Sequence, residues 1–148
     1  MPTLTKSIHV LLIVLSLFLA ITAFGGGIQL LTGFYVPPVE MLAGSPFTDY
    51  TVPGLALGLI VGGSALTAAV FLIRKNRFAS LASASAGVTV MTFEFVEVLA
   101  IGFPEGPAGF MQLLYFGLGI IIVVASFGQW FMELTQAPVL NNVSQRIK

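Results

Sequence analysis

The sequence predicts an all-helical bundle of four membrane-spanning helices with both termini on the cytoplasmic side. The chain of 148 residues is 57% hydrophobic and only 8% charged, whereas a soluble domain has about 25% charged residues. All six Lys and Arg residues fall at edges of apolar segments that would share one side of a membrane, and the positive-inside rule assigns that side to the cytoplasm. The length leaves room for about four spans and no separate soluble domain. We therefore expect one integral domain, 1–148, in the lipid bilayer of the plasma membrane.

The first span is expected at about residues 8–31, entering from the cytoplasm after Lys6. Its outer third contains three consecutive glycines, Gly25, Gly26 and Gly27. Inside a membrane such a run is tolerated where a neighbouring helix approaches the bare backbone closely. We expect these glycines to pack helices together.

The second span is expected at about 53–73, after an outer loop over 38–52 that contains a short helical turn. Pro53 suits the first turn of a helix, because its missing N–H would have no partner there. Small residues recur along this span at helical spacing: Gly54, Gly58 and Gly62. Such a stripe is typical of close helix packing in lipid.

The third span is expected at about 78–101, after a four-residue basic turn that makes the second and third spans antiparallel neighbours. Spacings of three and four place seven residues of this span on one seam. They are Ser80, Ser83, Gly87, Val90, Glu94, Glu97 and Ile101. The seam is small at the cytoplasmic end and acidic towards the outer end.

The fourth span is expected at about 108–134, with Gln112 and Tyr115 on one face near its outer end. The polar tail 138–148 is expected to be loosely ordered. No internal repeat is apparent, so the chain does not resemble an inverted-repeat transporter.

Composition excludes several kinds of chemistry. With no cysteine there is no disulfide, thiolate metal site or thiol redox centre. The single histidine, His9, excludes a multi-histidine metal site and lies far from the acids, which excludes a Ser-His-Asp triad. A net charge of zero makes nucleic acid an unsuitable partner. We predict no metal and no cofactor other than a bound lipid.

Glu94 and Glu97 are the strongest candidates for function, because an acidic side chain within a span is costly to expose to lipid and normally faces the bundle interior. They lie one helical turn apart, and two carboxylates that close repel. Three functional interpretations are a shared proton, a bound cation and a hydrogen-bonded polar ligand. The structural alternative is that they fasten helices together through partners such as Gln29, Gln112, Tyr115 or Thr92.

The glycine runs and the acids suggest one further hypothesis. If the glycine faces of the first two spans do not close completely, an apolar crevice opens towards Glu94 and Glu97. Such a crevice would suit a lipid or isoprenoid tail with a polar head.

Three segments resemble a family of small prokaryotic four-span membrane proteins of unassigned function. They are the sequences GSPFTDYTVPG at 44–54, EVLAIG at 97–102 and QLLYF at 112–116. The similarity extends from Gly25 to about Ala125 and implies four helices with a structured first outer loop, but no reaction. It also implies that the position of Glu97 takes Glu or Gln and that Glu94 has no fixed counterpart. Hydrogen bonding at Glu97 would then matter more than charge, which favours the helix clamp.

The leading functional hypothesis is a non-enzymatic membrane protein, acting as a small subunit of a membrane complex or as a homo-oligomer, with an outer-half crevice for a hydrophobic ligand. One alternative is a proton or cation transporter or channel in which an oligomer gathers Glu94 and Glu97 around a pore. Another is an intramembrane enzyme that uses the two acids on an isoprenoid-like lipid.

Overall fold

The computed structural model describes the backbone of residues 2–34 and 36–146 and the side chains of 3–34 and 36–135. The described residues contain no strand. Four helical segments are long and apolar enough to cross a membrane, namely Thr3–Thr32, Thr51–Ile73, Ala79–Ile101 and Pro107–Thr135. This confirms the prediction of an all-helical fold with four helices long and apolar enough to span a membrane. The elements are α1 (Pro2–Thr32), the 3-10 turn η1 (Val39–Leu42), α2 (Thr51–Leu55), the π-helical segment η2 (Ala56–Gly62), α3 (Gly63–Ile73), α4 (Ala79–Ile101) and α5 (Pro107–Arg146).

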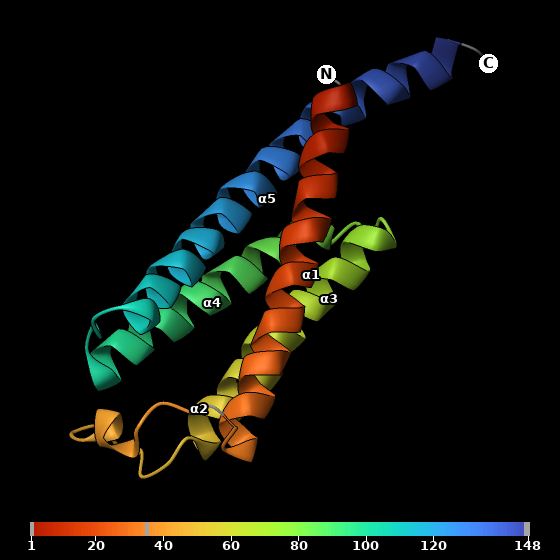
Figure 1. Ribbon diagram of the computed structural model, residues 1–148. Helices are drawn as coiled ribbons and strands as arrows, with labels where there is room; N and C mark the ends of the chain where they lie inside the picture. The colour runs from red at the N-terminus through yellow and green to blue at the C-terminus, as the bar shows by residue number, and fades with distance from the viewer. Residues whose placement is uncertain (1, 35, 147–148) are drawn as a thin grey trace.

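The helices form two packed layers that cross (Figure 1). α4 packs along α5, while α1 packs against α2, η2 and α3 and also touches α5. α2, η2 and α3 follow one another without a break and form a single continuous helix from Thr51 to Ile73. We call α1, this continuous helix, α4 and α5 the four rods, numbered in chain order. We call the end of the bundle with residues 36–50 and the turn 102–106 the loop end, and the end with the start of α1 and the turn 74–78 the terminal end.

Two helices are longer than the sequence predicted. α1 already begins at Pro2, and α5 continues to Arg146, so the segment expected as a loosely ordered tail is helical as far as the described residues go. At 1.5 Å per residue, the 40 residues of α5 extend about 60 Å, roughly twice the hydrocarbon thickness of a bilayer. Hydropathy marks only the part of a helix that lies in lipid, which is why the polar continuation was missed.

The core of the bundle consists of leucines and small residues contributed by all four rods. Leu12 and Leu19 of α1, Leu72 of α3 and Ile122 of α5 are almost completely buried, and the alanines Ala65, Ala68 and Ala86 fill the space between them. Small side chains at these positions let helices approach closely, which is how association is stabilised where lipid removes the hydrophobic driving force.

Glycines bring α1 against the second rod, as the sequence predicted. A Cβ atom at Gly27 would lie 2.8 Å from the Gly54 carbonyl oxygen and 2.9 Å from the Gly58 Cα atom. At Gly62 an added Cβ would meet the Phe24 ring at 3.2 Å. Backbone therefore packs on backbone at Gly27, whereas at Gly62 the absence of a side chain makes room for the Phe24 ring.

Gly25 does not share this packing role. It is exposed, and an added Cβ would meet nothing within 4 Å. Consecutive residues of a helix point about 100° apart, so three glycines in a row cannot all face one neighbour. Gly26 turns towards Leu57, whose side chain would lie 2.9 Å from an added Cβ.

A second close contact joins α4 and α5 midway along the bundle. Added Cβ atoms at Gly87 and at Gly119 would each lie 2.8 Å from the carbonyl oxygen of the other glycine. Five of the seven residues of the seam predicted on α4 are buried, namely Ser80, Ser83, Gly87, Val90 and Glu94. The other two, Glu97 and Ile101, are partly buried at its outer end.

The loop between α1 and α2 folds back over the loop end through local hydrogen bonds. The Tyr50 hydroxyl donates to the Pro38 carbonyl oxygen at 3.1 Å, and the Thr51 backbone N–H donates to Asp49 Oδ1 at 2.8 Å. The second bond satisfies one of the free N–H groups at the start of α2 and holds the pKa of the Asp49 carboxyl below its usual value. The predicted helical turn in this loop is η1, and its Leu42 is buried.

Candidate functional site

A cavity of about 500 Å³ lies at the loop end, lined by residues of all four rods and of the folded loop. Most of its lining is apolar, including Leu19, Leu30, Leu57, Phe93, Val96 and Met111. Its volume falls in the range of small-molecule sites, about 300–1,000 Å³. It lies where the sequence predicted an apolar crevice near the acids.

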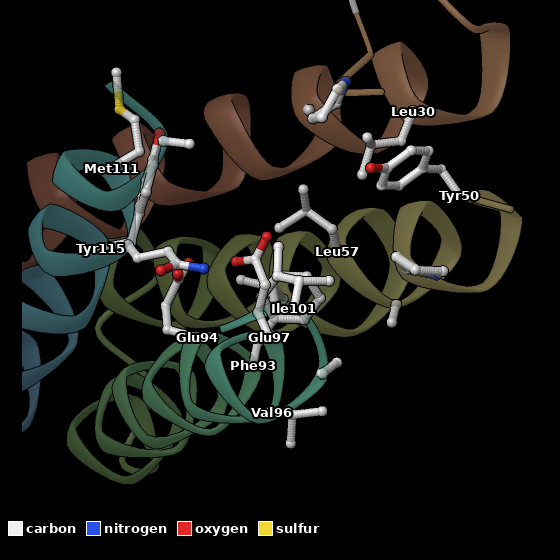
Figure 2. A pocket seen from close by; sticks show the side chains of 18 of the residues that line it. Leu30, Tyr50, Leu57, Phe93, Glu94, Val96, Glu97, Ile101, Met111 and Tyr115 are labelled. Carbon is white, nitrogen blue, oxygen red and sulfur yellow. The ribbon is translucent and has the colours of Figure 1, made fainter. Parts of the chain in front are cut away.

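Glu94 and Glu97 project from α4 into this cavity (Figure 2). The Glu94 side chain is 6% exposed, and Glu97 is partly buried. The two residues are three positions apart on α4, so their side chains are neighbours on one face of the helix. Two ionised carboxylates that close in an apolar cavity repel, and a proton or a cation shared by the pair relieves the repulsion.

Gln112 of α5 is the least satisfied polar group of the site. It lines the cavity beside the Glu97 carboxyl and is only 5% exposed. Neither its Nε2 nor its Oε1 atom has a hydrogen-bond partner of ordinary geometry. Each buried polar group left in this state costs about 1–3 kcal/mol, so this amide is poised to bond to something that enters the cavity.

Two tyrosines, Tyr115 and Tyr50, and one further glutamine, Gln29, also line the cavity. Tyr115 of α5 stands beside the acids in Figure 2 and stacks on Phe18 of α1, with 6.5 Å between ring centroids. Tyr50 covers the cavity from the loop, and burial raises its pKa, assisted by the negative charges of Glu97 and Glu40. Gln29 also lines the cavity, although most of its side chain is exposed at the end of α1.

None of the basic side chains that the structure describes lines the cavity. The described Lys and Arg side chains, Lys6, Arg74, Lys75 and Arg77, belong to the terminal end. Among the described residues, no three His, Asp or Glu side chains come together in a way that would hold a metal ion.

The structure brings together Glu94, Glu97, Gln29, Gln112 and Tyr115 around one cavity, as the sequence suggested. Thr92 is the exception among the expected partners, since it is exposed and its hydroxyl donates to the Val88 carbonyl oxygen of its own helix at 2.9 Å. Of the predicted packing glycines, Gly26 also lines the cavity. The first outer loop was expected to lie over the outer end of the bundle, but Phe47 and Tyr50 were not named as site residues, because a loop sequence does not show which of its side chains face a cavity.

Sequence reasoning also missed a second polar group at the terminal end, which we call the Glu133 cluster: Ser80, Gln129 and Glu133. Gln129 Nε2 donates to Glu133 Oε1 at 2.8 Å, and the Ser80 hydroxyl donates to Glu133 Oε2 at 3.4 Å, linking α4 to α5. The spacing of four residues between Gln129 and Glu133 is one that brings side chains together on a helix, and it was visible in the sequence.

Comparison of the chain with protein-family models, curated proteins and solved structures gives no match. The resemblance to a family of four-span proteins therefore stays a prediction, and the function has to be argued from the site itself.

Proposed function

We propose that this protein is a non-enzymatic, multi-pass membrane protein that binds a mainly apolar small molecule with a polar head in the cavity at the loop end. The observation that carries the proposal is the unpartnered amide of Gln112 beside the Glu94–Glu97 pair in a cavity with apolar walls. A ligand site commonly has this composition, with a few converging polar groups that fix orientation and an apolar lining that provides affinity.

The orientation proposed for this site follows from charge. The positive-inside rule assigns the terminal end to the cytoplasm of a plasma-membrane protein. The cavity then lies in the outer half of the bilayer, where a lipid or another amphiphile can enter from the outer leaflet.

Two features favour ligand binding over the other interpretations of the acids. A helix clamp needs satisfied hydrogen bonds, and Gln112 has none. An oligomeric pore needs the acids at an interface between copies, whereas Glu94 is 6% exposed within a single chain.

Native mass spectrometry of the gently extracted protein tests the proposal. We expect the wild type to retain one reproducible small molecule. Ala100→Phe, at a position that lines the cavity, should lose it. Leu99→Phe is the matched control, because Leu99 is 71% exposed on the lipid-facing side of the same helix.

If Ala100→Phe keeps the small molecule as Leu99→Phe does, the molecule does not bind in this cavity. If the wild type has the mass of the protein alone, the proposal of ligand binding is also contradicted. Stoichiometric association with other polypeptides, with no small molecule bound, would instead support an accessory subunit. A homo-oligomer that keeps the ligand is compatible with the proposal.

A second candidate is an intramembrane enzyme acting on an isoprenoid-like lipid. It is favoured by one observation, that two neighbouring carboxyls face a cavity, as a general acid and base would have to. This function predicts that a lipid added to the purified protein is recovered chemically altered. Recovery of the lipid unchanged would support simple binding.

A further inference from the structure

The charge of the cavity points to the chemistry of its ligand. Glu94 and Glu97 are carboxyl groups in a mainly apolar cavity, and among residues 3–34 and 36–135 no Lys, Arg or His lines it. Ionised carboxylates so placed are costly unless a positive charge is near. A cation brought in by the ligand would supply that charge.

The lining also fits a cationic head. Phe47, Tyr50, Phe93 and Tyr115 all line the cavity, and aromatic faces attract organic ammonium groups. The Gln112 Oε1 atom, which has no donor, adds an acceptor beside the acids. The apolar residues farther from the acids would surround an alkyl or aryl body.

Without a cation, a proton takes its place. Glu94 and Glu97 line the same cavity from positions three residues apart on α4. Both groups cannot readily ionise side by side in an apolar site. Proton and organic cation would therefore compete for the same pair of carboxyls.

We infer that the cavity binds a lipophilic cation, an amine or quaternary ammonium with an apolar body, and that its entry displaces the proton held between Glu94 and Glu97. The exchange is balanced: one cation enters, one proton leaves to solvent, and the charge of the site is unchanged. This inference rests on the proposed function, because it specifies the head group of the same ligand.

Polar groups from every packed element line the cavity near the Glu94–Glu97 pair. The groups contributed by the packed elements are Gln29 of α1, Tyr50 of the loop, Gln112 and Tyr115 of α5 and, farther off, Glu40 of η1. Glu40 is the only other carboxyl among them, and it is exposed. The exchanged proton is therefore assigned to the buried pair.

The test uses the full chain in lipid nanodiscs, titrated with decyltrimethylammonium and, separately, with decan-1-ol as an uncharged probe of the same chain length. Proton release is measured with a pH-sensitive dye in weak buffer, and empty nanodiscs give the background. For the wild type near neutral pH we expect roughly one proton released per cation bound and none for the alcohol. The affinity for the cation should then fall by up to about tenfold for each pH unit of acidification, as one-proton linkage requires.

Substitutions inside and outside the cavity show whether cation binding depends on Glu94 and Glu97. Glu94→Gln and Glu97→Gln should each weaken cation binding by roughly tenfold or more, as expected for loss of a close charge in a buried site, and release no proton. Glu133→Gln, at the other end of the bundle, should behave like the wild type. If a Gln variant fails to fold, the proton count and pH dependence of the wild type still decide the matter.

The outcomes distinguish the two proposals. Cation binding without proton release, or equal binding by the Gln variants, would overturn the exchange. Binding of decan-1-ol but not of the cation would overturn the cationic head and leave the proposed function standing. If a folded wild type binds neither probe above background, both fail.

Discussion

The two ends of the α4–α5 pair use the same residue types to opposite effect. At the terminal end, Glu133 accepts hydrogen bonds from Gln129 and Ser80. At the loop end, Glu94 and Glu97 meet Gln112, whose amide atoms have no hydrogen-bond partner, at the wall of a cavity. A Glu and a Gln side by side can thus make a clamp or a binding site. What distinguishes the two regions is that the Gln129 Nε2 atom has an acceptor, although its Oε1 atom has no partner, whereas both amide atoms of Gln112 lack one and space is left beside them.

Substitution at the contact of Gly87 with Gly119, which lies between these two regions, should have the largest effect on the stability of the protein. At Gly119 an added Cβ would lie 2.5 Å from Met91 and 2.8 Å from the Gly87 carbonyl oxygen, so Gly119→Ala must push α4 and α5 apart. We expect it to lower the free energy of unfolding by about 1–3 kcal/mol, the usual cost of overpacking, in unfolding titrations of the purified protein. Gly117→Ala and Gly128→Ala are matched controls on α5, since an added Cβ there meets nothing within 4 Å. A similar loss in the controls would mean that helix contact is not the cause.

Removing the side-chain amide of Gln129 and removing that of Gln112 should have opposite effects on the stability of the protein. Gln129→Leu takes away the 2.8 Å donor to Glu133 and should destabilise the protein by about 1–2 kcal/mol, as loss of a hydrogen bond to a charged group does. Gln112→Leu removes an unpartnered amide and should leave the ligand-free protein unchanged or stabilise it by up to about 1 kcal/mol, while ligand retention falls. Unfolding measurements on ligand-stripped protein provide the comparison. Equal destabilisation by both changes would show that Gln112 is also part of a clamp.

The cover of the cavity should depend on Tyr50. Tyr50→Phe removes the hydrogen bond to the Pro38 carbonyl oxygen, a contribution of about 0.5–1.5 kcal/mol to the local closure of the loop. Hydrogen exchange of residues 36–50 should speed up, and bound ligand should dissociate faster. The Glu133 cluster should keep its exchange protection. Faster exchange at both ends would instead indicate general destabilisation.

The smallest effect should come from Asp49 at the start of α2. Its pKa is lowered in the folded protein by the hydrogen bond from the Thr51 N–H. Its stabilising contribution is therefore complete above the pKa of the unfolded chain and is lost as the pH falls through the lower folded value. Protection of the Thr51 amide against exchange should decline over that acidic range in the wild type and lose this dependence in Asp49→Asn. The terminal end should show no matching change, and an unaltered pH profile in the variant would refute the assignment.

The sequence was sufficient to predict the four apolar helices and the packed face of α4. It was not sufficient to predict the cavity between the helices. Hydropathy predicts the four rods because lipid requires apolar surfaces and satisfied backbones, and the spacing of three places Glu94 and Glu97 on the buried seam of α4. The contact of Gly27 with Gly54 and Gly58 was also predictable, since small residues at helical spacing are typical of close packing.

Other features depend on relations between distant residues. The cavity exists because the crossing of the α1 and α4 layers leaves space that the loop covers through Tyr50, and no local pattern encodes a crossing angle. Gly25 resembled its two neighbours in sequence, but the helical rotation turns it away from the second rod. The Glu133 cluster had a visible spacing, yet only the structure shows that Ser80 reaches it from α4.

An experimental structure of the protein in lipid nanodiscs, without added detergent, tests the ligand site at the loop end most directly. We expect elongated non-protein density in this cavity, with its polar end at Glu94, Glu97 and Gln112, and a Glu133 cluster bonded as described. A Gln112 amide bonded to Glu97, with neighbouring side chains filling the cavity, would contradict this expectation and would make both ends of the α4–α5 pair clamps.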